Sequence, residues 1–156
     1  MLHVVLFEPE IPPNTGNVIR LCANTGAALH LVKPLGFRLD DKGLRRSGLD
    51  YHDIASVNVH AGFDACLAAL GGARLLAVET GGRHCYSEFK FCAGDALLFG
   101  PETRGLPPDV LQRVGHEHTL YIPMREQSRS INLANAVALV AYEAWRQAGF
   151  SGAAAL

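Results

Sequence analysis

Stretches with strand character alternate with helical stretches along the whole chain of 156 residues, and this alternation limits the possible folds more than any other feature. Short apolar runs bounded by turn residues predict strands at residues 2–7, 29–32, 56–59, 74–79, 96–99 and 119–123. Longer apolar patterns predict helices at residues 16–25, 42–48, 63–70, 107–114 and 131–148. Strands separated by helices form a parallel sheet covered on both faces. We therefore predict one α/β domain over residues 1–156, with a tail that frays from about residue 150.

The charge balance limits how this chain could bind nucleic acid. Its formal net charge is −1, and only 19% of its residues are charged. A protein that grips long DNA or RNA through its phosphates is usually more basic. Nucleic-acid contact would need a local patch, and one candidate consists of Arg38, Lys42, Arg45 and Arg46. The same residues are equally compatible with a solvated helix face. We expect no DNA binding.

The cysteines and the distribution of apolar residues point to a cytosolic protein. The four cysteines show no CxxC spacing, which disfavours a zinc ribbon or a redox motif. Cys22 and Cys66 lie in apolar, helix-like settings, and we predict that both are core residues. No signal peptide precedes the first predicted strand, and no apolar run reaches about 18 residues. We expect a cytoplasmic protein with reduced thiols that does not enter a membrane.

The first unusual loop, residues 9–26, follows the first predicted strand. Pro12 and Pro13 predict an irregular segment before the helix, and Asn14 or Thr15 could cap that helix. Asn17, Arg20 and Asn24 recur at spacings of three and four residues, which places them on one stripe of the helix. The stripe is either a wet surface or a set of groups that bind something, because asparagine is a poor helix former.

The second unusual loop is "LLFGPETRGLP", residues 97–107, where an apolar strand runs into glycine and proline. Gly100 and Gly105 allow sharp turns and a close approach of the backbone to a ligand. The spacing resembles a phosphate-binding loop, but Leu106 and Pro107 stand where that motif has Lys and Ser or Thr. The segment is therefore either a plain turn or a ligand loop of another kind.

The third unusual segment is "IPMREQSRSINLANAVALVAYE", which leads from a strand into the last helix. Ser130 could cap this helix, and Asn132 and Asn135 share one of its faces. Leu139 and Tyr142 continue the same face, and the helix is apolar on most sides. We therefore expect the two amides to be buried. A buried amide without partners costs about 1–3 kcal/mol, so these should bond to loop backbone or to a bound molecule.

Together the three segments "NTGNVIRLCANTG", "LLFGPETRGLP" and "IPMREQSRSINLANAVALVAYE" resemble, in order, the motifs of the SPOUT-class RNA ribose 2′-O-methyltransferases. The likeness is greatest to the short TrmL-type enzymes that act on the wobble nucleotide of tRNA, and it covers essentially the whole chain. It implies a parallel sheet flanked by helices with a deep trefoil knot near the C-terminus. It also implies a homodimer that uses S-adenosylmethionine as methyl donor and needs no metal.

The resemblance assigns roles to particular residues. It implies that Arg20 acts on the ribose 2′-hydroxyl and that Asn14, Asn17 and Asn135 orient Arg20 or the ribose. Arg129 and Tyr142, with Asn17, are the predicted RNA contacts. The implied cofactor-binding residues are Val78, Gly100, Glu102, Ile122, Met124, Ser130 and Leu133. Arginine is a poor base because its pKa exceeds about 12, so Arg20 could instead polarise the hydroxyl or stabilise developing alkoxide charge.

The implied substrate is the anticodon stem-loop of tRNA, with cytidine or a modified uridine at the wobble position of leucine isoacceptors. An unstacked loop suits a chain with no additional RNA-binding domain. Two alternatives stay open: a ribose methyltransferase for another tRNA or rRNA site, and a non-catalytic RNA-binding module with the same fold. Other chemistries lack their motifs, since there is no HExxH or GxSxG sequence and the seven histidines are scattered.

Overall fold

A computed structural model describes residues 1–39 and 57–154 of the chain. Its strands are β1 (His3–Phe7), β2 (Ala28–Val32), β3 (Asn58–His60), β4 (Leu75–Val78), β5 (His84–Cys85), β6 (Ala96–Phe99) and β7 (Thr119–Tyr121). Its helices are α1 (Pro12–Thr25), α4 (Phe63–Leu70), α5 (Pro108–Val114) and α6 (Leu133–Gln147), with the short 3₁₀ helix η1 (His116–His118). The described residues contain no helix long and apolar enough to cross a membrane.

The strands form one seven-stranded sheet in the order β3-β2-β1-β6-β4-β7-β5. Every pairing is parallel, which confirms the predicted sheet. Strand β6 lies between β1 and β4, so the chain first builds outward from β1 and later returns to its other side. Such a reversal leaves a crevice at the carboxyl ends of the central strands, where parallel sheets bind their ligands.

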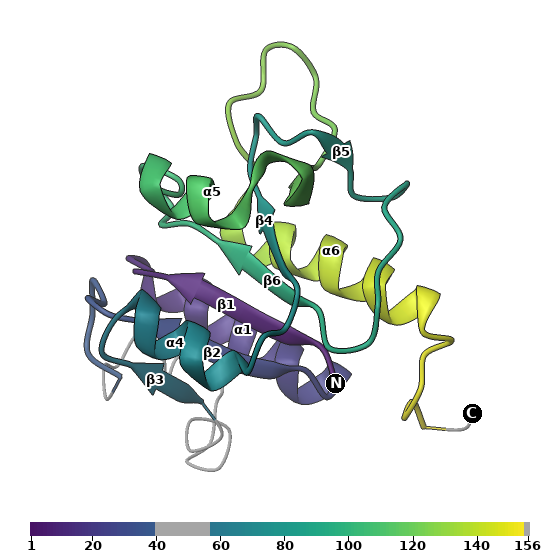
Figure 1. The fold of residues 1–156 in the computed structure, drawn as a ribbon, viewed down its shortest axis with the longest axis horizontal. Helices are drawn as coiled ribbons and strands as arrows, with labels where there is room; N and C mark the ends of the chain where they lie inside the picture. The colour runs from purple at the N-terminus through teal and green to yellow at the C-terminus, as the bar shows by residue number, and fades with distance from the viewer. Residues whose placement is uncertain (40–56, 155–156) are drawn as a thin grey trace.

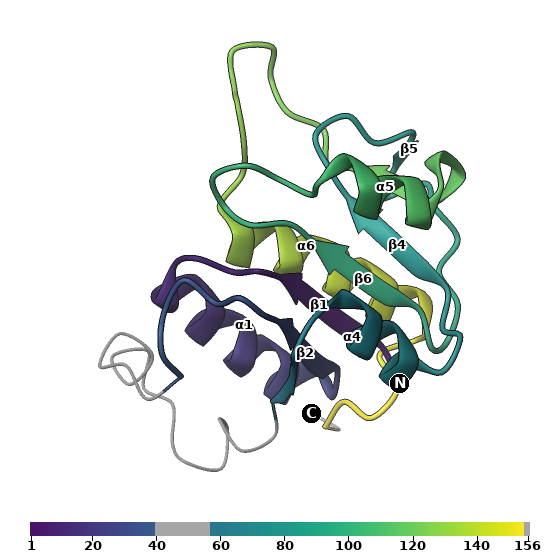
Figure 2. The ribbon, with the colours of Figure 1, turned by 60° about the vertical axis from the view of Figure 1, so that its left-hand side comes forward.

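The ribbon in Figure 1 shows helices on both faces of the sheet. Alternate residues of the central strands enter two separate cores. Val4 and Leu6 of β1 pack into the core beneath α1 and α6, whereas Val5 and Phe7 pack into the core beneath α4 and α5. Figure 2 shows α4 and α5 on one side of the sheet and α1 and α6 on the other. Strands buried on both faces read as continuous apolar runs, which is why "HVVLF" and "ALLF" lack polar alternation.

Helix α1 begins four residues earlier than predicted, at Pro12 instead of residue 16. The first-turn N–H groups of a helix have no partner within the helix, so proline is tolerated there and its fixed φ favours the turn. Pro12 and Pro13 therefore start the helix, and the prediction that they exclude it was wrong. The predicted caps were wrong for the same reason. Asn14 and Thr15 lie inside the first turns, and the N-cap is Ile11, which has no side-chain hydrogen bond.

Other differences are smaller. Strand β5, only two residues long, was not predicted, and β3 lies at Asn58–His60 instead of 56–59. Cys22 and Cys66 are buried, as expected. The predicted helix at 42–48 and three members of the basic patch, Lys42, Arg45 and Arg46, lie outside the described residues. At the C-terminal end, Trp145 Nε1 donates to the carbonyl oxygen of Ser151 at 2.9 Å, which ties the start of the tail to α6.

Candidate active site

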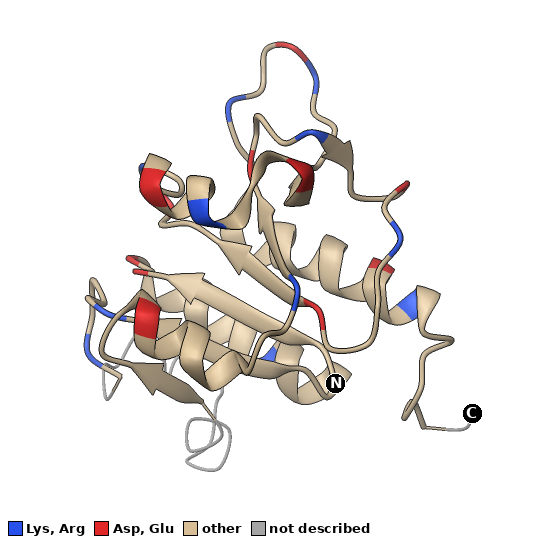
Figure 3. Ribbon diagram, viewed as in Figure 1, with Lys and Arg blue, Asp and Glu red and all other residues tan. Residues whose placement is uncertain are grey.

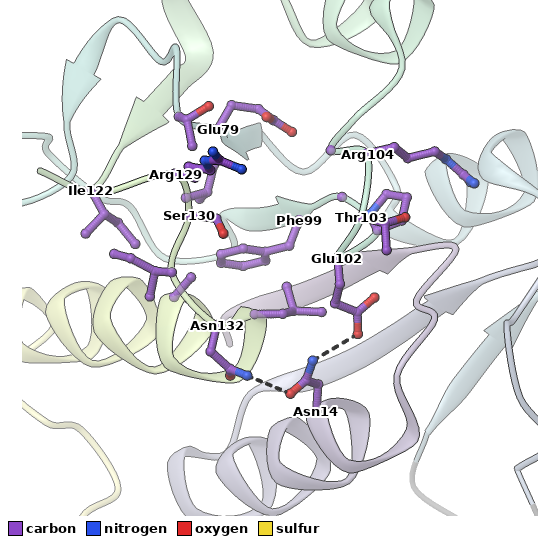
Figure 4. A pocket seen from close by; sticks show the side chains of 18 of the residues that line it. Asn14, Glu79, Phe99, Glu102, Thr103, Arg104, Ile122, Arg129, Ser130 and Asn132 are labelled. Atoms are coloured by element: carbon purple, nitrogen blue, oxygen red, sulfur yellow. Dashed lines mark hydrogen bonds between the residues drawn. The ribbon is translucent and has the colours of Figure 1, made fainter. Parts of the chain in front are cut away.

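A cavity of about 530 Å³ lies at the carboxyl ends of β4, β6 and β7 (Figure 4). This volume is within the range of about 300–1,000 Å³ that is usual for small-molecule sites. Val78 ends β4, Phe99 ends β6, and Ile122 follows β7, so three adjacent strands contribute to the wall. The remaining wall comes from Ile11 and the first turn of α1, the loop at residues 100–105, the loop at residues 122–132 with the start of α6, and the two residues after β4. The first three of these are the segments that the sequence singled out.

A chain of hydrogen bonds joins these three segments at the floor of the cavity (Figure 4). Asn14 Nδ2 donates to Glu102 Oε1 at 3.2 Å, and Asn132 Nδ2 donates to Asn14 Oδ1 at 2.9 Å. Asn14 is only 7% exposed, and both polar atoms of its amide form hydrogen bonds inside the protein, as buried polar groups usually do. The carboxylate of Glu102 also accepts the backbone N–H groups of Glu10 and Ile11 at 2.8 and 3.1 Å.

This carboxylate serves the start of α1 as an external cap. Ile11 supplies no side-chain acceptor, and Glu102 binds two N–H groups at that end from a loop more than 90 residues away. A negative charge next to a helix N-terminus is also favoured by the helix dipole. The geometry therefore gives Glu102 a structural role that the sequence did not reveal.

Further polar contacts fasten the loop at residues 100–105 to the segment before α1. Thr103 Oγ1 donates to Glu10 Oε2 at 2.7 Å, and the backbone N–H of Thr103 donates to the same oxygen at 3.1 Å. Arg104 forms ion pairs with Glu8 and Glu10. These groups are partly exposed, so their ion pairs contribute little stability individually. Together these contacts connect the loop at residues 100–105 to the segment before α1 at the rim of the cavity.

Glu79 shapes the other side of the cavity and was not predicted as a site residue. Its Oε1 accepts the backbone N–H of Leu106 at 2.7 Å. Burial raises the pKa of Glu79, and the hydrogen bond from Leu106 opposes part of that rise. An acid directly after the apolar strand "LLAV" is the sequence signal that could have found it, because carboxyl ends of strands face the ligand crevice.

The cavity depends on close contact between two loop segments. A Cβ atom added to Gly100 would lie 2.5 Å from the carbonyl carbon of Gly105 and from the nitrogen of Leu106. Gly105 itself has φ +68, a conformation that residues with a side chain rarely adopt. The loop at residues 100–105 therefore needs both glycines, one for space and one for its backbone conformation.

All seven predicted cofactor residues line this one cavity: Val78, Gly100, Glu102, Ile122, Met124, Ser130 and Leu133. The structure thus brings together residues that are up to 55 positions apart in the sequence. Their assignment to cofactor binding stays a prediction. Ser130 is not the N-cap of α6, because Asn132 has that role and its Oδ1 accepts the N–H groups of Ala134 and Asn135 at 3.0 and 3.3 Å.

The predicted catalytic and RNA-binding residues divide into two groups. Asn14 and Arg129 line the cavity. The others are exposed on the side of α1 and α6 that points away from the sheet: Asn17, Arg20, Asn135 and Tyr142. We call this side, together with exposed Leu139, the outer face of the α1–α6 layer.

The expectation of two buried amides at the start of α6 was wrong, because Asn132 and Asn135 are both exposed. The predicted shared face does exist, but it points to solvent. Leu139 and Tyr142 on it are 42% and 43% exposed. The buried amide of the network is instead Asn14, whose partner on α6 is Asn132.

Figure 3 shows two basic positions on the loop between β7 and α6. Arg125 and Arg129 are exposed there, with Glu126 between them. The predicted patch around Arg38 cannot be compared, since its other members lie outside the described residues.

Comparison with known proteins connects this geometry with one family. The family model described as "SpoU rRNA Methylase family" matches residues 1–142. A tRNA (cytidine(34)-2′-O)-methyltransferase of Aeromonas hydrophila is 57% identical over 152 residues, which cover 97% of each chain. The likeness extends over nearly the full length of both proteins.

Solved structures of related proteins support the same family. A structure described as giving insights into the 2-OH methylation of C/U34 on tRNA superposes with a TM-score of 0.88, at 51% identity. It covers 96% of this chain and 97% of the other. The SpoU methyltransferase AviRb from Streptomyces viridochromogenes, in complex with the cofactor AdoMet, superposes with a TM-score of 0.77 at 27% identity. Here the match covers 95% of this chain and 58% of AviRb.

Proposed function

Because this chain belongs to the SpoU rRNA Methylase family, we propose that it is a tRNA methyltransferase that acts on the 2′-hydroxyl of the wobble nucleotide. The methyl donor is S-adenosylmethionine. The observation that carries the proposal is the full-length identity of 57% to a relative named tRNA (cytidine(34)-2′-O)-methyltransferase. A second relative of the same name, from Escherichia coli, is 55% identical over 98% of both chains. We extend the proposal to cytidine or a modified uridine of leucine tRNAs.

The cavity suits the proposed cofactor. S-adenosylmethionine has an apolar purine, a polar ribose and a charged methionine tail. Phe99, Ile122 and Leu133 provide apolar surface for a purine, and the strand ends beside them supply backbone donors and acceptors. Glu79, Thr103 and Ser130 provide polar groups for hydroxyl and ammonium groups. We propose that the transfer needs no metal, because the sulfonium of the methyl donor carries its own leaving group.

The bound cofactor would supply an activated methyl group whose sulfonium carries its own leaving group. The protein must then hold the ribose oxygen in line with that methyl and assist loss of the hydroxyl proton. Alignment of two reactants can contribute several kcal/mol to catalysis. We assign the action on the 2′-hydroxyl to Arg20, as stabiliser of developing negative charge, and we assign phosphate contact to Arg129.

Arg20 lies outside the cavity of its own chain, which favours a homodimer as the active form. The outer face of the α1–α6 layer combines polar Arg20 and Asn135 with exposed apolar Leu139 and Tyr142. Exposed apolar side chains beside functional polar groups are typical of protein interfaces. We propose that two chains pair through this face, so that Arg20 and Asn135 of one protomer complete the site of the other.

Two further features belong to the proposal. We propose that the segment from residue 122 to α6 threads through the loop at residues 100–105 in a trefoil knot, since both segments line one cavity and Asn132 bonds across them to Asn14. A crystal structure with continuous density from β6 to α6 tests that path. We also propose that the enzyme works in the cytoplasm, where tRNA is modified.

Methylation of synthetic tRNA tests the proposed function directly. With radiolabelled S-adenosylmethionine, a leucine tRNA transcript should accept one methyl group, and a transcript with a 2′-deoxy wobble nucleotide should accept none. Methylation that survives this deoxy substitution would contradict the wobble assignment and favour another RNA site. Failure to bind S-adenosylmethionine in calorimetry up to millimolar concentration would instead favour a non-catalytic RNA-binding module.

The role of Arg20 needs its own variant. Arg20→Ala should lower kcat by about 100-fold or more, as expected when a group that acts on the reacting proton is removed. Cofactor affinity should change little. Arg113→Ala is the matched control, because Arg113 is also exposed, pairs with Asp64 at 2.7 Å and does not line the cavity. An unchanged kcat in Arg20→Ala would remove Arg20 from the mechanism.

A further inference from the structure

Three histidines that are scattered in the sequence meet on one face of the sheet. His3, His30 and His60 belong to the adjacent strands β1, β2 and β3. They lie on the side that α4 covers, where their strand neighbours Val5 and Val32 pack into the α4 core. Cys66 projects from α4 toward the same place and is 0% exposed. None of the four lines the active-site cavity, so this cluster is separate from the proposed methyl transfer.

The cluster has a defined geometry. His30 Nδ1 and His60 Nε2 lie 2.9 Å apart, and His30 Nε2 lies 3.0 Å from His3 Nδ1. One nitrogen of His30, one nitrogen of His60 and the sulfur of Cys66 all lie within 4.8 Å of one another. Among the described residues, no hydrogen bond reaches the sulfur. Two ring nitrogens and one thiol therefore converge on a single small volume.

The chemistry of these groups suits a borderline-soft metal ion. Zinc is bound at about 2.0–2.1 Å by histidine nitrogen and at about 2.3 Å by thiolate sulfur, which puts tetrahedral ligand atoms about 3.3–3.6 Å apart. The two nitrogens need to separate by a few tenths of an ångström, and the sulfur needs to move inward by a side-chain adjustment. Neutral imidazoles are required, and burial already lowers the pKa of His30 to about 4, with the nearby His3 and His60 acting in the same direction.

His3 provides the outer contact that such sites usually have. A histidine that binds a metal through one nitrogen generally donates its other N–H to an acceptor, which fixes its tautomer. If His30 binds through Nδ1, its Nε2 carries the proton, and His3 Nδ1 is the acceptor at 3.0 Å. With Nδ1 as the ligand atom of His30, the contact with His3 fixes the tautomer of His30.

We propose that His30, His60 and Cys66 form a zinc-type metal site that joins β2, β3 and α4, with its fourth position open to water. Binding replaces the thiol proton by the ion: the S–H bond breaks, a metal–sulfur bond forms, and the proton leaves to solvent. Because the ion displaces the thiol proton, occupancy should fall as pH decreases. The site lies away from the cavity, and its role is structural.

Cobalt(II) is the probe that reports both the ligand atoms and the geometry. The starting protein is the full chain without a purification tag and with Cys85→Ser and Cys92→Ser, because these two less buried thiols could bind cobalt elsewhere. Titration should reach one equivalent, with visible bands typical of tetrahedral cobalt and a near-ultraviolet thiolate-to-metal band. Zinc should displace the cobalt, since it binds such sites more tightly.

Substitutions then identify the ligands. Cys66→Ser should abolish the thiolate band, whereas Cys22→Ser, which alters a buried cysteine in the opposite core, should keep it. His60→Gln should weaken binding by more than the about 10–100-fold that an outer-contact change causes, and His3→Phe should weaken it by about that amount. His60 is partly exposed, so its variant tests the site even if Cys66→Ser fails to fold. Absence of one-equivalent binding, a thiolate band that survives in Cys66→Ser, or an unchanged cobalt affinity in His60→Gln overturns the proposal.

Discussion

Glu102 is the residue through which the loop at residues 100–105 reaches the start of α1. It accepts three hydrogen bonds, from the backbone of Glu10 and Ile11 and from the side chain of Asn14. Hydrogen bonds to a charged acceptor contribute about 1.5–3 kcal/mol each, and removal of the acceptor leaves the donors without a partner. The residue was predicted only as a cofactor contact, because nothing in its local sequence points to donors more than 85 positions away.

We expect Glu102→Ala to lower the free energy of unfolding by about 2–4 kcal/mol, since three donors lose one shared acceptor. Urea denaturation monitored by circular dichroism measures this change. Glu126→Ala is the control, because Glu126 is an exposed acid in the neighbouring loop and should change stability by less than about 0.5 kcal/mol. Equal effects of the two substitutions would show that the Glu102 network does not stabilise the fold.

Glu79 should make stability depend on pH. Because its pKa is raised in the folded protein, the folded state holds this proton more tightly than the unfolded chain does. The resulting stabilisation is complete below the unfolded pKa and is lost as pH rises through the folded pKa. Glu79→Gln keeps an acceptor for the Leu106 N–H but has no such titration.

The variant should therefore gain stability relative to the natural protein as pH rises from about 4.5 to about 7.5. Urea unfolding at both pH values measures the difference. A constant difference across this interval would contradict the raised pKa.

At the level of single helices, the start of α6 shows how one residue determines where a helix begins. Both Ser130 and Asn132 are common capping residues, and the sequence favoured Ser130. The structure uses Asn132, because its amide can accept two N–H groups of α6 while donating to Asn14. A serine hydroxyl is too short to do all three. Ser130 is thereby left free to line the cavity.

We expect Asn132→Ala to cost about 1–3 kcal/mol, from the lost cap and from the unpaired oxygen of buried Asn14. Ser130→Ala should leave stability within about 0.5 kcal/mol and should weaken cofactor binding instead. Denaturation and calorimetry on the same two variants separate these effects. A stability loss in Ser130→Ala equal to that in Asn132→Ala would mean that the cap has been placed wrongly.

The loop at residues 100–105 gives a second test at this scale. Gly100→Ala places a methyl group 2.5 Å from backbone atoms of Gly105 and Leu106, so the two segments must move apart. Overpacking of this kind costs about 1–3 kcal/mol and should also weaken cofactor binding. Gly81→Ala is the control, because a Cβ there meets nothing within 4 Å and its φ is not positive. Thermal unfolding and calorimetry distinguish the two.

The sequence could predict those parts of the fold that depend on interactions between residues close together in the chain. Strands β1, β4 and β6 are apolar runs with clear boundaries, and each was found within two residues. The predicted helix for α1 started too late, because the effect of Pro12 depends on whether proline stands inside a helix or at its first position. Strand β5 has only two residues and exists because it pairs with β7, which no local pattern could show.

At the scale of the whole molecule, the seven residues that the resemblance assigns to cofactor binding line one cavity, and their role stays a prediction. They can meet there because parallel strands present their carboxyl ends at one edge. The bonds that hold the loops together were not predicted, since Asn14 and Asn132 are 118 residues apart. Nor was the meeting of His3, His30 and His60, which depends on the register of three strands.

The proposed dimer gives a prediction for the intact protein. Leu139→Lys places a charge on the outer face of the α1–α6 layer and should convert the dimer to monomer, with loss of methylation. Val59→Lys is the control, because Val59 is 38% exposed on the edge strand β3, away from that face. Analytical ultracentrifugation measures the mass of each variant. A monomeric natural protein, or a dimer that persists in Leu139→Lys, would contradict the proposed interface.

The position of β6 between β1 and β4 has a consequence for synthesis on the ribosome. His3 pairs with Ala96, so one edge of the first strand has no partner until roughly 90 further residues have been translated. At about 5–20 residues per second, that interval lasts several seconds. During this time the apolar strand "HVVLF" exposes unpaired backbone groups to other nascent chains. The nascent protein should therefore depend on chaperones until its central strand emerges.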